Sequence, residues 1–316
     1  MKMDKHSRAP KDFDQKKYPR SKAAFGYYGA KQKIATRIIE ALPPHNCWVE
    51  AFCGSAAITL FKEPAQIEII NDVNGEIVNV FRQLRNRPKA LIKAIALTPY
   101  AREEFLDVRE KPKRKVNQLE RARRFLAMSM MTVNGTIGKV RCGFSFSQSY
   151  SREGKEARVN RWFNFPERLQ RVADRLRNIR IENRDARELV RMFRNRPATV
   201  IYLDPPYFVK RDHGYTIDAN DEKFHRELLE LCCKCKCMVV ISGYETKLYD
   251  ELLTAKKGWK KTKIRTRTRD TTGKDYARTE IIWRNKHCMQ AIKKDAVPIR
   301  LTRKEKAQNK VNPPRK

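Results

Sequence analysis

Hydrophobic positions along this chain follow two periods that alternate, one typical of helices and the other of strands. In the first stretch, Ile34, Ile38 and Leu42 recur at the spacing of one helical face, and an apolar run typical of a strand follows them. Helix, strand, helix and strand are expected in this order at residues 33–42, 47–53, 55–61 and 67–73. Because helices alternate with strands, the pattern predicts an α/β fold with a parallel sheet.

The same alternation returns later in the chain. Helices are expected at residues 166–178, 186–193 and 222–232, and strands at residues 179–183, 200–204, 238–244 and 280–285. Two separated stretches with one pattern indicate a single α/β domain, assembled from residues 23–80 and 178–285.

Residues 81–177, between the two stretches, follow a different pattern. Basic helical periodicity fills residues 81–97, 101–110 and 116–131. Residues 133–165 are rich in Gly, Ser and Arg, which suits a hairpin or a loop. An inserted helical domain is therefore expected over residues 81–177. The polar and basic ends, residues 1–22 and 286–316, are expected to be cationic tails.

Composition narrows the class of protein. With 316 residues and 41% hydrophobic content, the chain is long enough to bury a core. No apolar run approaches the ~18 residues of a membrane span, and the N-terminal residues lack the apolar region of a secretory signal. A cytoplasmic protein with reduced cysteines is expected. The cluster of Cys232, Cys233, Cys235 and Cys237 lacks the paired spacing of a zinc site, so no metal is predicted.

The net charge indicates the kind of partner. Against 36 Asp and Glu residues stand 70 Lys and Arg residues, a formal net charge of +34. Such an excess favours a polyanion, nucleic acid above all, with an affinity that falls as salt rises. The alternative, a basic surface that binds nothing, is more usual at smaller charge excesses.

Four turns that follow predicted strands carry residues suited to ligand binding. Gly54 and Asp72 follow the first two strands, Asp185 follows a later one, and Asp204 begins the sequence DPPY. Taken singly, the glycine is an ordinary tight turn and each acid is a helix cap. Because the carboxyl ends of parallel strands share one edge of a sheet, the four together predict a ligand site at that edge.

The sequence DPPY, Asp204–Tyr207, ends a buried strand abruptly. Pro205 and Pro206 cannot donate to the ladder of the sheet, and their fixed φ makes the turn stiff. The Asp204 carboxylate and the Tyr207 ring are therefore expected at a rigid corner.

In their order and spacing, these motifs resemble the Dam-type (alpha class) adenine-N6-specific DNA methyltransferases, over roughly residues 23 to 285. The resemblance implies a Rossmann-like sheet that binds S-adenosylmethionine, with residues 81–177 as an inserted helical DNA-recognition domain. Related tetrapeptides also serve RNA-adenine, cytosine-N4 and glutamine methylation. The alternatives are an RNA adenine-N6 or DNA cytosine-N4 methyltransferase, or an inactive nucleic-acid-binding relative.

The family's cofactor motifs are recognisable in the sequence. FGYYGAK at 25–31 and EAFCGSA at 50–56 are similar to its glycine-bearing elements, with Ala30 and Ala56 in place of glycines. Asp72 in INDVN matches the acid that binds the ribose. The resemblance implies cofactor contacts by Tyr27, Lys31, Glu50, Phe52, Gly54, Asp72 and Asp185.

The catalytic residues implied by the resemblance are Asp204, Pro205, Pro206 and Tyr207. An adenine in a duplex must flip out of the stack before it can react, and Tyr207 would then stack on the flipped base. Asp204 and the Pro205 carbonyl would accept the protons of its exocyclic amine. Positioning and electrostatics then suffice, without a metal or a covalent intermediate.

The expected partner is double-stranded DNA. Basic residues of the Gly-bearing stretch are the predicted contacts, because arginines suit guanine edges and phosphates. They are Lys139, Arg141, Arg152, Lys155, Arg158 and Arg161. The resemblance also admits a cognate restriction endonuclease as a partner, and a monomer or weak dimer is expected.

Overall fold

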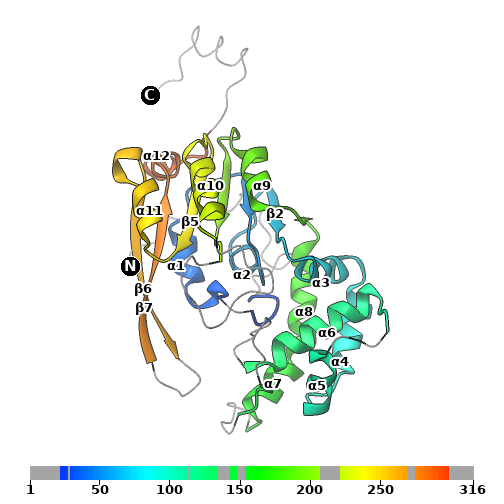
Figure 1. Cartoon of the computed structure of the whole chain (residues 1–316). Coiled ribbons are helices and arrows are strands. Elements are labelled where there is room, and N and C mark those ends of the chain that lie inside the picture. The colour runs from blue at the N-terminus through cyan, green and yellow to red at the C-terminus, as the bar shows by residue number, and fades with distance from the viewer. Residues whose placement is uncertain are drawn as a thin grey trace, which may run out of the picture.

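The protein is described by a computed structural model, which covers residues 22–27, 29–110, 112, 114–133, 143–147, 154–206, 221–269 and 275–298. Within these residues the fold is mixed α/β, built on a seven-stranded sheet with the order β3-β2-β1-β4-β5-β7-β6 (Figure 1). The strands are β1 (Cys47–Glu50), β2 (Ile67–Asn71), β3 (Ile179–Glu182), β4 (Thr199–Leu203), β5 (Met238–Gly243), β6 (Lys260–Arg269) and β7 (Asp275–Arg284).

The prediction of a parallel sheet is confirmed for β1 to β5 and wrong for the last strand. β7 pairs antiparallel with both β5 and β6. Only Ile281 to Arg284 of β7 pair with β5, so the rest of β7 and its partner β6 continue as a two-stranded ribbon. The pattern gave no sign of β6, whose sequence KKTKIRTRTR contains a single aliphatic residue.

Helices cover both faces of the sheet. One face packs against α9 (Ala186–Phe193), α10 (Glu222–Cys233) and α11 (Lys247–Leu252). The other packs against α1 (Ala35–Glu40), α2 (Ala57–Phe61) and α12 (Lys286–Lys294). The central strands β1, β4 and β5 are buried along their whole length, as continuous apolar runs in a sheet covered on both faces should be.

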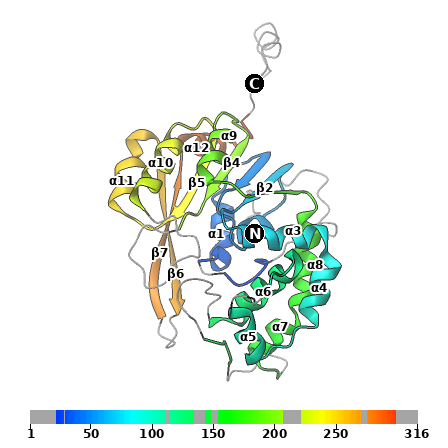
Figure 2. The same ribbon diagram turned by 45° about the vertical axis from the view of Figure 1, so that its right-hand side comes forward.

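The described residues between β2 and β3 are mainly helical, and their helices lie at the β3 end of the sheet (Figure 2). They are α3 (Gly75–Asn86), α4 (Pro88–Ala96), α5 (Arg102–Arg109), α6 (Gln118–Met131), α7 (Ala157–Phe163) and α8 (Phe165–Leu176). Their apolar residues form one core cluster with Ile70 of β2, Ile179 of β3 and Phe25 of the N-terminal loop. The helices are therefore packed continuously onto the sheet.

The expected hairpin or loop over residues 133–165 is only partly present. Phe144 forms an isolated antiparallel bridge with Thr132, which is hairpin-like pairing. The end of this stretch, however, is the helix α7. Its N-terminus is capped by the side chain of Glu156, and Trp162 is buried. The capping acid and the buried indole fix a helix where glycine and serine content favoured a loop.

The expected C-terminal tail is wrong for residues 286–294, which form α12. Cys288 and Ala291 of this helix are buried against the sheet. The Asn285 side chain caps the helix, accepting from the Cys288 amide, and is also bonded to the backbone of β5 and the residue before it. The apolar pattern of this helix is short and flanked by lysines, so its helical signal in the sequence is weak.

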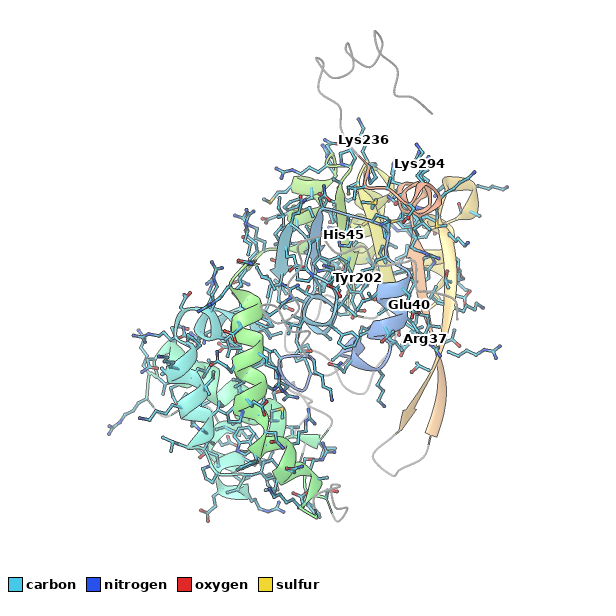
Figure 3. The ribbon with its side chains drawn as sticks, turned by 180° about the vertical axis from the view of Figure 1, so that it is seen from behind. Arg37, Glu40, His45, Tyr202, Lys236 and Lys294 are labelled. Atoms are coloured by element: carbon cyan, nitrogen blue, oxygen red, sulfur yellow. The ribbon has the colours of Figure 1, made fainter. Side chains whose placement is uncertain are left out.

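The β6–β7 ribbon is hydrogen-bonded to α1. Arg37 Nη1 donates to the Arg265 carbonyl at 2.9 Å, and Figure 3 shows Arg37 and Glu40 of α1 beside the ribbon. In the described part of the chain, no helix is long and apolar enough to cross a membrane.

The cysteine cluster lies at the junction of α10 and β5, as expected. Cys232, Cys235 and Cys237 are buried free thiols, and Cys233 is exposed. Burial raises the pKa of Cys232 well above its usual value. Among the described residues, no group of three His, Cys, Asp or Glu is placed to hold a metal ion.

Candidate functional site

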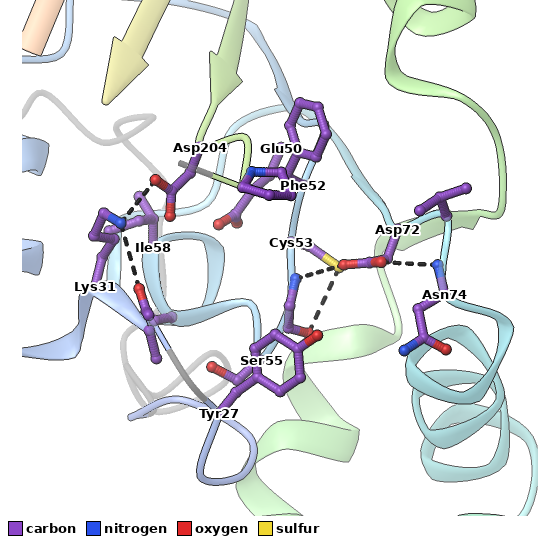
Figure 4. A pocket seen from close by; sticks show the side chains of 16 residues that line it. Tyr27, Lys31, Glu50, Phe52, Cys53, Ser55, Ile58, Asp72, Asn74 and Asp204 are labelled. Atoms are coloured by element: carbon purple, nitrogen blue, oxygen red, sulfur yellow. Dashed lines mark hydrogen bonds and ion pairs between the residues drawn. The ribbon is translucent and has the colours of Figure 1, made fainter. Parts of the chain in front are cut away.

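A pocket lies where the carboxyl ends of β1, β2 and β4 meet the N-terminal loop (Figure 4). It is lined by Tyr27, Gly29, Ala30, Lys31, Glu50, Phe52, Cys53, Gly54, Ser55, Ala57, Ile58, Asp72, Val73, Asn74, Asp204 and Pro206. The strand-end position predicted from the sequence is therefore where the pocket is found. Six of the seven expected cofactor residues line it, together with two of the four expected catalytic residues.

One end of the pocket is formed by Asp72 and Gly54. The Asp72 carboxylate accepts hydrogen bonds from the amides of Gly54 and Asn74, both at 2.9 Å. Burial raises the pKa of Asp72 to about 6, against the opposing effect of these two amides. At neutral pH the group is ionised, and its remaining lone pairs can accept from hydroxyls in the pocket.

Gly54 is required at this turn for two reasons. Its φ of +48° lies in the left-handed region, and a Cβ there would lie 3.0 Å from the Tyr27 ring. Any side chain would be strained by the backbone conformation and would displace the aromatic wall of the pocket.

The two alanines that stand in place of family glycines differ in their backbone conformation. Ala30 has φ −55° and ψ 131°, which any residue adopts without strain. Ala56 has φ 53° and ψ 37°, a left-handed conformation that costs an L residue about 1 kcal/mol more than glycine. The backbone at position 56 therefore has a conformation that favours glycine, although alanine occupies it.

A second acid, Glu50, lies between the two ends of the pocket. It is buried, and its Oε2 accepts hydrogen bonds from both the amide and the hydroxyl of Thr59. Burial raises the pKa of Glu50 to about 8, although the two Thr59 donors lower it. Glu50 is therefore mostly protonated at pH 7, and its second oxygen can donate a hydrogen bond.

The other end of the pocket is formed by Asp204. Lys31 Nζ lies 2.7 Å from Asp204 Oδ1 and 3.6 Å from a Glu280 oxygen. The Ser242 hydroxyl donates to the same Oδ1 at 2.9 Å, and Ser242 is itself hydrogen-bonded to the Tyr202 hydroxyl at 2.8 Å. An opposite charge and a hydroxyl from separate elements thus fix the orientation of the Asp204 carboxylate.

Two of the expected residues are placed away from the pocket lining. Asp185 caps α9, accepting from the Arg187 amide, and pairs with the Arg187 guanidinium at 2.6 Å. This local partner lowers the pKa of Asp185. Its role beside the cofactor stays a prediction. Pro205 is not among the lining residues either, although its neighbours are.

The remaining expected residues fall into two groups. Tyr207, Lys139, Arg141 and Arg152 lie outside the described residues. Lys155, Arg158 and Arg161 are described, and they lie just before or within α7. The Lys155 ammonium lies over the Phe163 ring, 5.1 Å from its centroid.

Sequence reasoning missed several residues of the site. Asn74 both donates to Asp72 and caps α3, and its signal was an Asn placed just before a helical run. Ser242 is the last residue but one of β5 and the polar residue in an otherwise apolar strand. Glu280 carried no local signal, because it reaches Lys31 from a distant strand.

The chain is similar to a known protein family and to a named relative. A family model described as D12 class N6 adenine-specific DNA methyltransferase matches residues 27–268. The Type II methyltransferase M1.LlaDCHI of Lactococcus lactis subsp. cremoris is 28% identical over 190 residues, which cover 57% of this chain and 63% of that protein. The chain thus spans less than two thirds of the length of this relative.

A solved structure, the SAM-dependent methyltransferase from Agrobacterium tumefaciens, aligns with 41% of this chain and 46% of its own. The alignment has a TM-score of 0.25 and 18% sequence identity.

Proposed function

Because the chain belongs to the family of D12 class N6 adenine-specific DNA methyltransferases, we propose that it methylates the exocyclic amine of adenine in double-stranded DNA. S-adenosylmethionine would be the methyl donor. The observation that carries the proposal is the pocket itself, in which Asp72 lines one cavity together with Asp204 and Pro206 of the DPPY corner. One cavity would then hold both the cofactor, at Asp72, and the reacting base, at Asp204.

The lining of the pocket fits the proposed cofactor. Asp72 is ionised at neutral pH and would accept hydrogen bonds from the two ribose hydroxyls. Phe52, held edge-to-face against Phe224 at 6.3 Å, offers an aromatic wall for a base. Because Glu50 is mostly protonated at pH 7, it would donate a hydrogen bond to the cofactor and would not repel its carboxylate. When bound, the cofactor supplies an activated methyl group on a sulfonium.

Asp204 is the proposed acceptor for the protons of the adenine amine. Lys31 and Ser242 both bind Oδ1, which leaves Oδ2 for the substrate. The amine lone pair would form the new N–C bond as the S–C bond of the donor breaks to leave a neutral thioether, and the proton lost by the nitrogen would pass to Asp204 Oδ2 and from there to solvent. By holding the amine protons, Asp204 would favour the pyramidal amine that can attack. Tyr207 would stack on the flipped base.

The helices between β2 and β3 are the proposed DNA-recognition region. The predicted DNA contacts Lys155, Arg158 and Arg161 lie just before or within α7 of this region. The net charge of +34 favours a polyanion as the partner. A cognate restriction endonuclease and a monomeric or weakly dimeric state belong to the same proposal. We propose site-specific methylation for this chain on these grounds, and the relative M1.LlaDCHI is matched over 63% of its length.

The test measures methyl transfer from labelled S-adenosylmethionine to duplex DNA, single-stranded DNA and RNA, with the modified nucleoside identified by mass. We expect N6-methyladenine in duplex DNA. In Asp204→Asn, which keeps the size of the side chain but removes its charge, we expect the rate to fall at least 100-fold. The matched control, Asp250→Asn, removes an exposed carboxylate paired with Lys261 and should leave the rate unchanged.

Each alternative has its own outcome. N4-methylcytosine or methylated RNA as the main product would replace the proposed substrate with one of the related substrates. An Asp204→Asn protein that transfers methyl groups at the parent rate would show that the corner is only a turn. A parent protein that binds DNA but produces no modified nucleoside would be an inactive binding relative.

A further inference from the structure

Two arginines of the helical region share one sulfur atom. Arg161 of α7 and Arg168 of α8 each direct Nη2 at Met130 Sδ of α6, at 3.7 Å and 3.4 Å. The Arg168 guanidinium also lies over the Phe165 ring, 4.7 Å from its centroid. Two positive groups are thus held side by side on a thioether and an aromatic ring, neither of which carries a negative charge.

Neither guanidinium forms an ion pair with any Asp or Glu among the described residues. Two other arginines of α8 do, since Arg171 pairs with Glu167 and Arg175 pairs with Glu68. Arg168 Nε is in addition buried without a hydrogen-bond partner in the described part of the chain. A planar fork with five donors therefore has donor capacity left over.

The arrangement is unfavourable in the free protein. Burial and, to a smaller extent, the nearby charges of Arg161 and Arg171 together lower the pKa of Arg168 to about 10. Burial and the charge of Arg158 lower the pKa of Arg161. Like charges that are partly desolvated and lack a counterion are costly, and an anion bound between them would relieve both effects.

The pair lies close to the pocket and is open on one side. A Cβ on Gly26 would lie 3.1 Å from Arg161 Nη2, and Gly26 directly precedes Tyr27 of the pocket wall. The Ser129 hydroxyl of α6 donates to the Gly26 carbonyl, which ties this loop to the helix carrying Met130. As a whole residue Arg161 is exposed, although its guanidinium is partly desolvated, and Arg168 is half-buried, so a ligand can approach from the Arg161 side.

We propose that Arg161 and Arg168 form a binding site for one backbone phosphate of DNA, with Met130 and Phe165 as its floor. The site rests on the proposed function, because it would hold the duplex next to the pocket that receives the base. Arginine forks match the tetrahedral oxygens of a phosphate, which several donors can share. Such a contact sets the position of DNA on the protein and reads no base. Arg168 was not among the contacts expected from the sequence.

The first experiment compares Arg168→Gln with Arg171→Gln. Both remove one charge from α8, but Arg171 is solvent-exposed and paired with Glu167. DNA affinity is measured by fluorescence anisotropy across a salt series. We expect Arg168→Gln to weaken binding about tenfold or more beyond the effect of Arg171→Gln, and to lower the salt slope by about one. Equal losses in the two variants would overturn the site.

The second experiment measures thermal unfolding without DNA, in inorganic phosphate and in chloride at matched ionic strength. Phosphate should raise the Tm of the parent protein more than that of Arg168→Gln. In chloride, Arg168→Gln should unfold at the parent Tm or higher, because an unpaired buried charge has been removed. If the Tm of Arg168→Gln in chloride lies below that of the parent protein, Arg168→Lys is measured instead, because it keeps the positive charge but lacks the planar guanidinium. The site is wrong if Arg168→Lys matches the parent in both DNA affinity and phosphate response.

These readouts are independent of methyl transfer. If the parent protein has no methyl-transfer activity but the variants still differ in DNA affinity and in the response of Tm to phosphate, the phosphate site is supported and the proposed reaction is wrong. If the parent protein is active and neither difference is found, the reaction is supported and the phosphate site is wrong.

Discussion

Two acids of one pocket, the half-buried Asp72 and the buried Glu50, reach different protonation states at neutral pH. Both pKa values are raised by burial, that of Asp72 to about 6 and that of Glu50 to about 8. Asp72 accepts from two backbone amides, one at each oxygen, whereas the Thr59 donors reach a single oxygen of Glu50. At pH 7 the pocket therefore presents one carboxylate and one neutral carboxyl group, an acceptor and a donor at separate places.

The ionisation of Asp72 should govern the pH dependence of cofactor binding. The affinity for S-adenosylmethionine should be level above pH 6 and fall by up to about tenfold per pH unit below it, because the protonated acid cannot accept from both ribose hydroxyls. Titration calorimetry between pH 5 and pH 8 measures this. Asp72→Asn should bind weakly at pH 8 and lack the change around pH 6. A parent affinity that is constant down to pH 5 would contradict the role given to Asp72.

The same pKa has an opposite consequence for the free protein. The unfolded chain loses the Asp72 proton near its usual pKa of 3.8, and the folded protein loses it only at about 6. Asp72 therefore lowers the free energy of unfolding as pH rises through this window, and the penalty persists above it. Site geometry at this residue opposes stability, which is common where a buried group serves binding.

At the scale of elements, α12 shows how one side chain joins a helix to the sheet. Asn285 Oδ1 accepts from the amides of Cys288 and Val239, at 3.1 Å and 3.2 Å, and Nδ2 donates to the Cys237 carbonyl at 2.9 Å. The residue therefore caps the helix and also satisfies backbone groups at the start of β5. Since α12 covers the central sheet, its docking protects the core formed with Trp48 and Val240.

Asn285→Ala should destabilise the protein much more than the loss of an ordinary helix cap. Removing the side chain leaves three buried backbone groups without their partner, which should lower the free energy of unfolding by about 2–4 kcal/mol. The control, Asn117→Ala, removes an exposed cap of α6 that accepts, within the described residues, from the Glu120 amide alone, and should cost about 1 kcal/mol. Urea unfolding of both variants gives the comparison. Equal losses would show that Asn285 acts only as a cap.

At the scale of the whole molecule, the pocket lies between two basic elements at opposite ends of the sheet. Helices α3 to α8 lie at the β3 end, and the β6–β7 ribbon extends from the other end (Figures 1 and 2). Acidic residues pair with part of the ribbon, since Lys261 contacts both Glu245 and Asp250. The terminal segments, residues 1–21 and 299–316, carry a further excess of Lys and Arg.

DNA binding should therefore contain a large component that ignores sequence. Removing residues 1–20 and 299–316 should flatten the dependence of log affinity on log salt, because fewer phosphate counterions are released. The preference for the target site should stay the same, since the proposed recognition region is kept. Anisotropy with target and scrambled duplexes measures both quantities. A truncated protein that loses its site preference would place recognition in the terminal segments.

The sequence by itself determined the elements whose signals are local. Apolar runs predicted β1, β2, β4 and β5, and helical periodicity predicted most of the helices, because burial on a sheet or helix face requires these spacings. The order of the glycine, acid and DPPY turns predicted the strand-end site and the resemblance to the family. Since parallel strands bring their carboxyl ends together, a one-dimensional pattern was enough to locate the pocket.

Only the tertiary structure decided features that depend on distant partners. Asp72 and Asp185 look alike in the sequence, but Asp72 meets the Gly54 amide in the pocket, whereas Asp185 is paired with the adjacent Arg187. The strand β6 owes its conformation to pairing with β7 rather than to an apolar pattern. The pairing of Arg161 with Arg168 has no sequence signature either, because it depends on how α6, α7 and α8 pack around Met130. These contacts depend on how the elements pack in three dimensions, and the spacing of residues along the chain does not encode them.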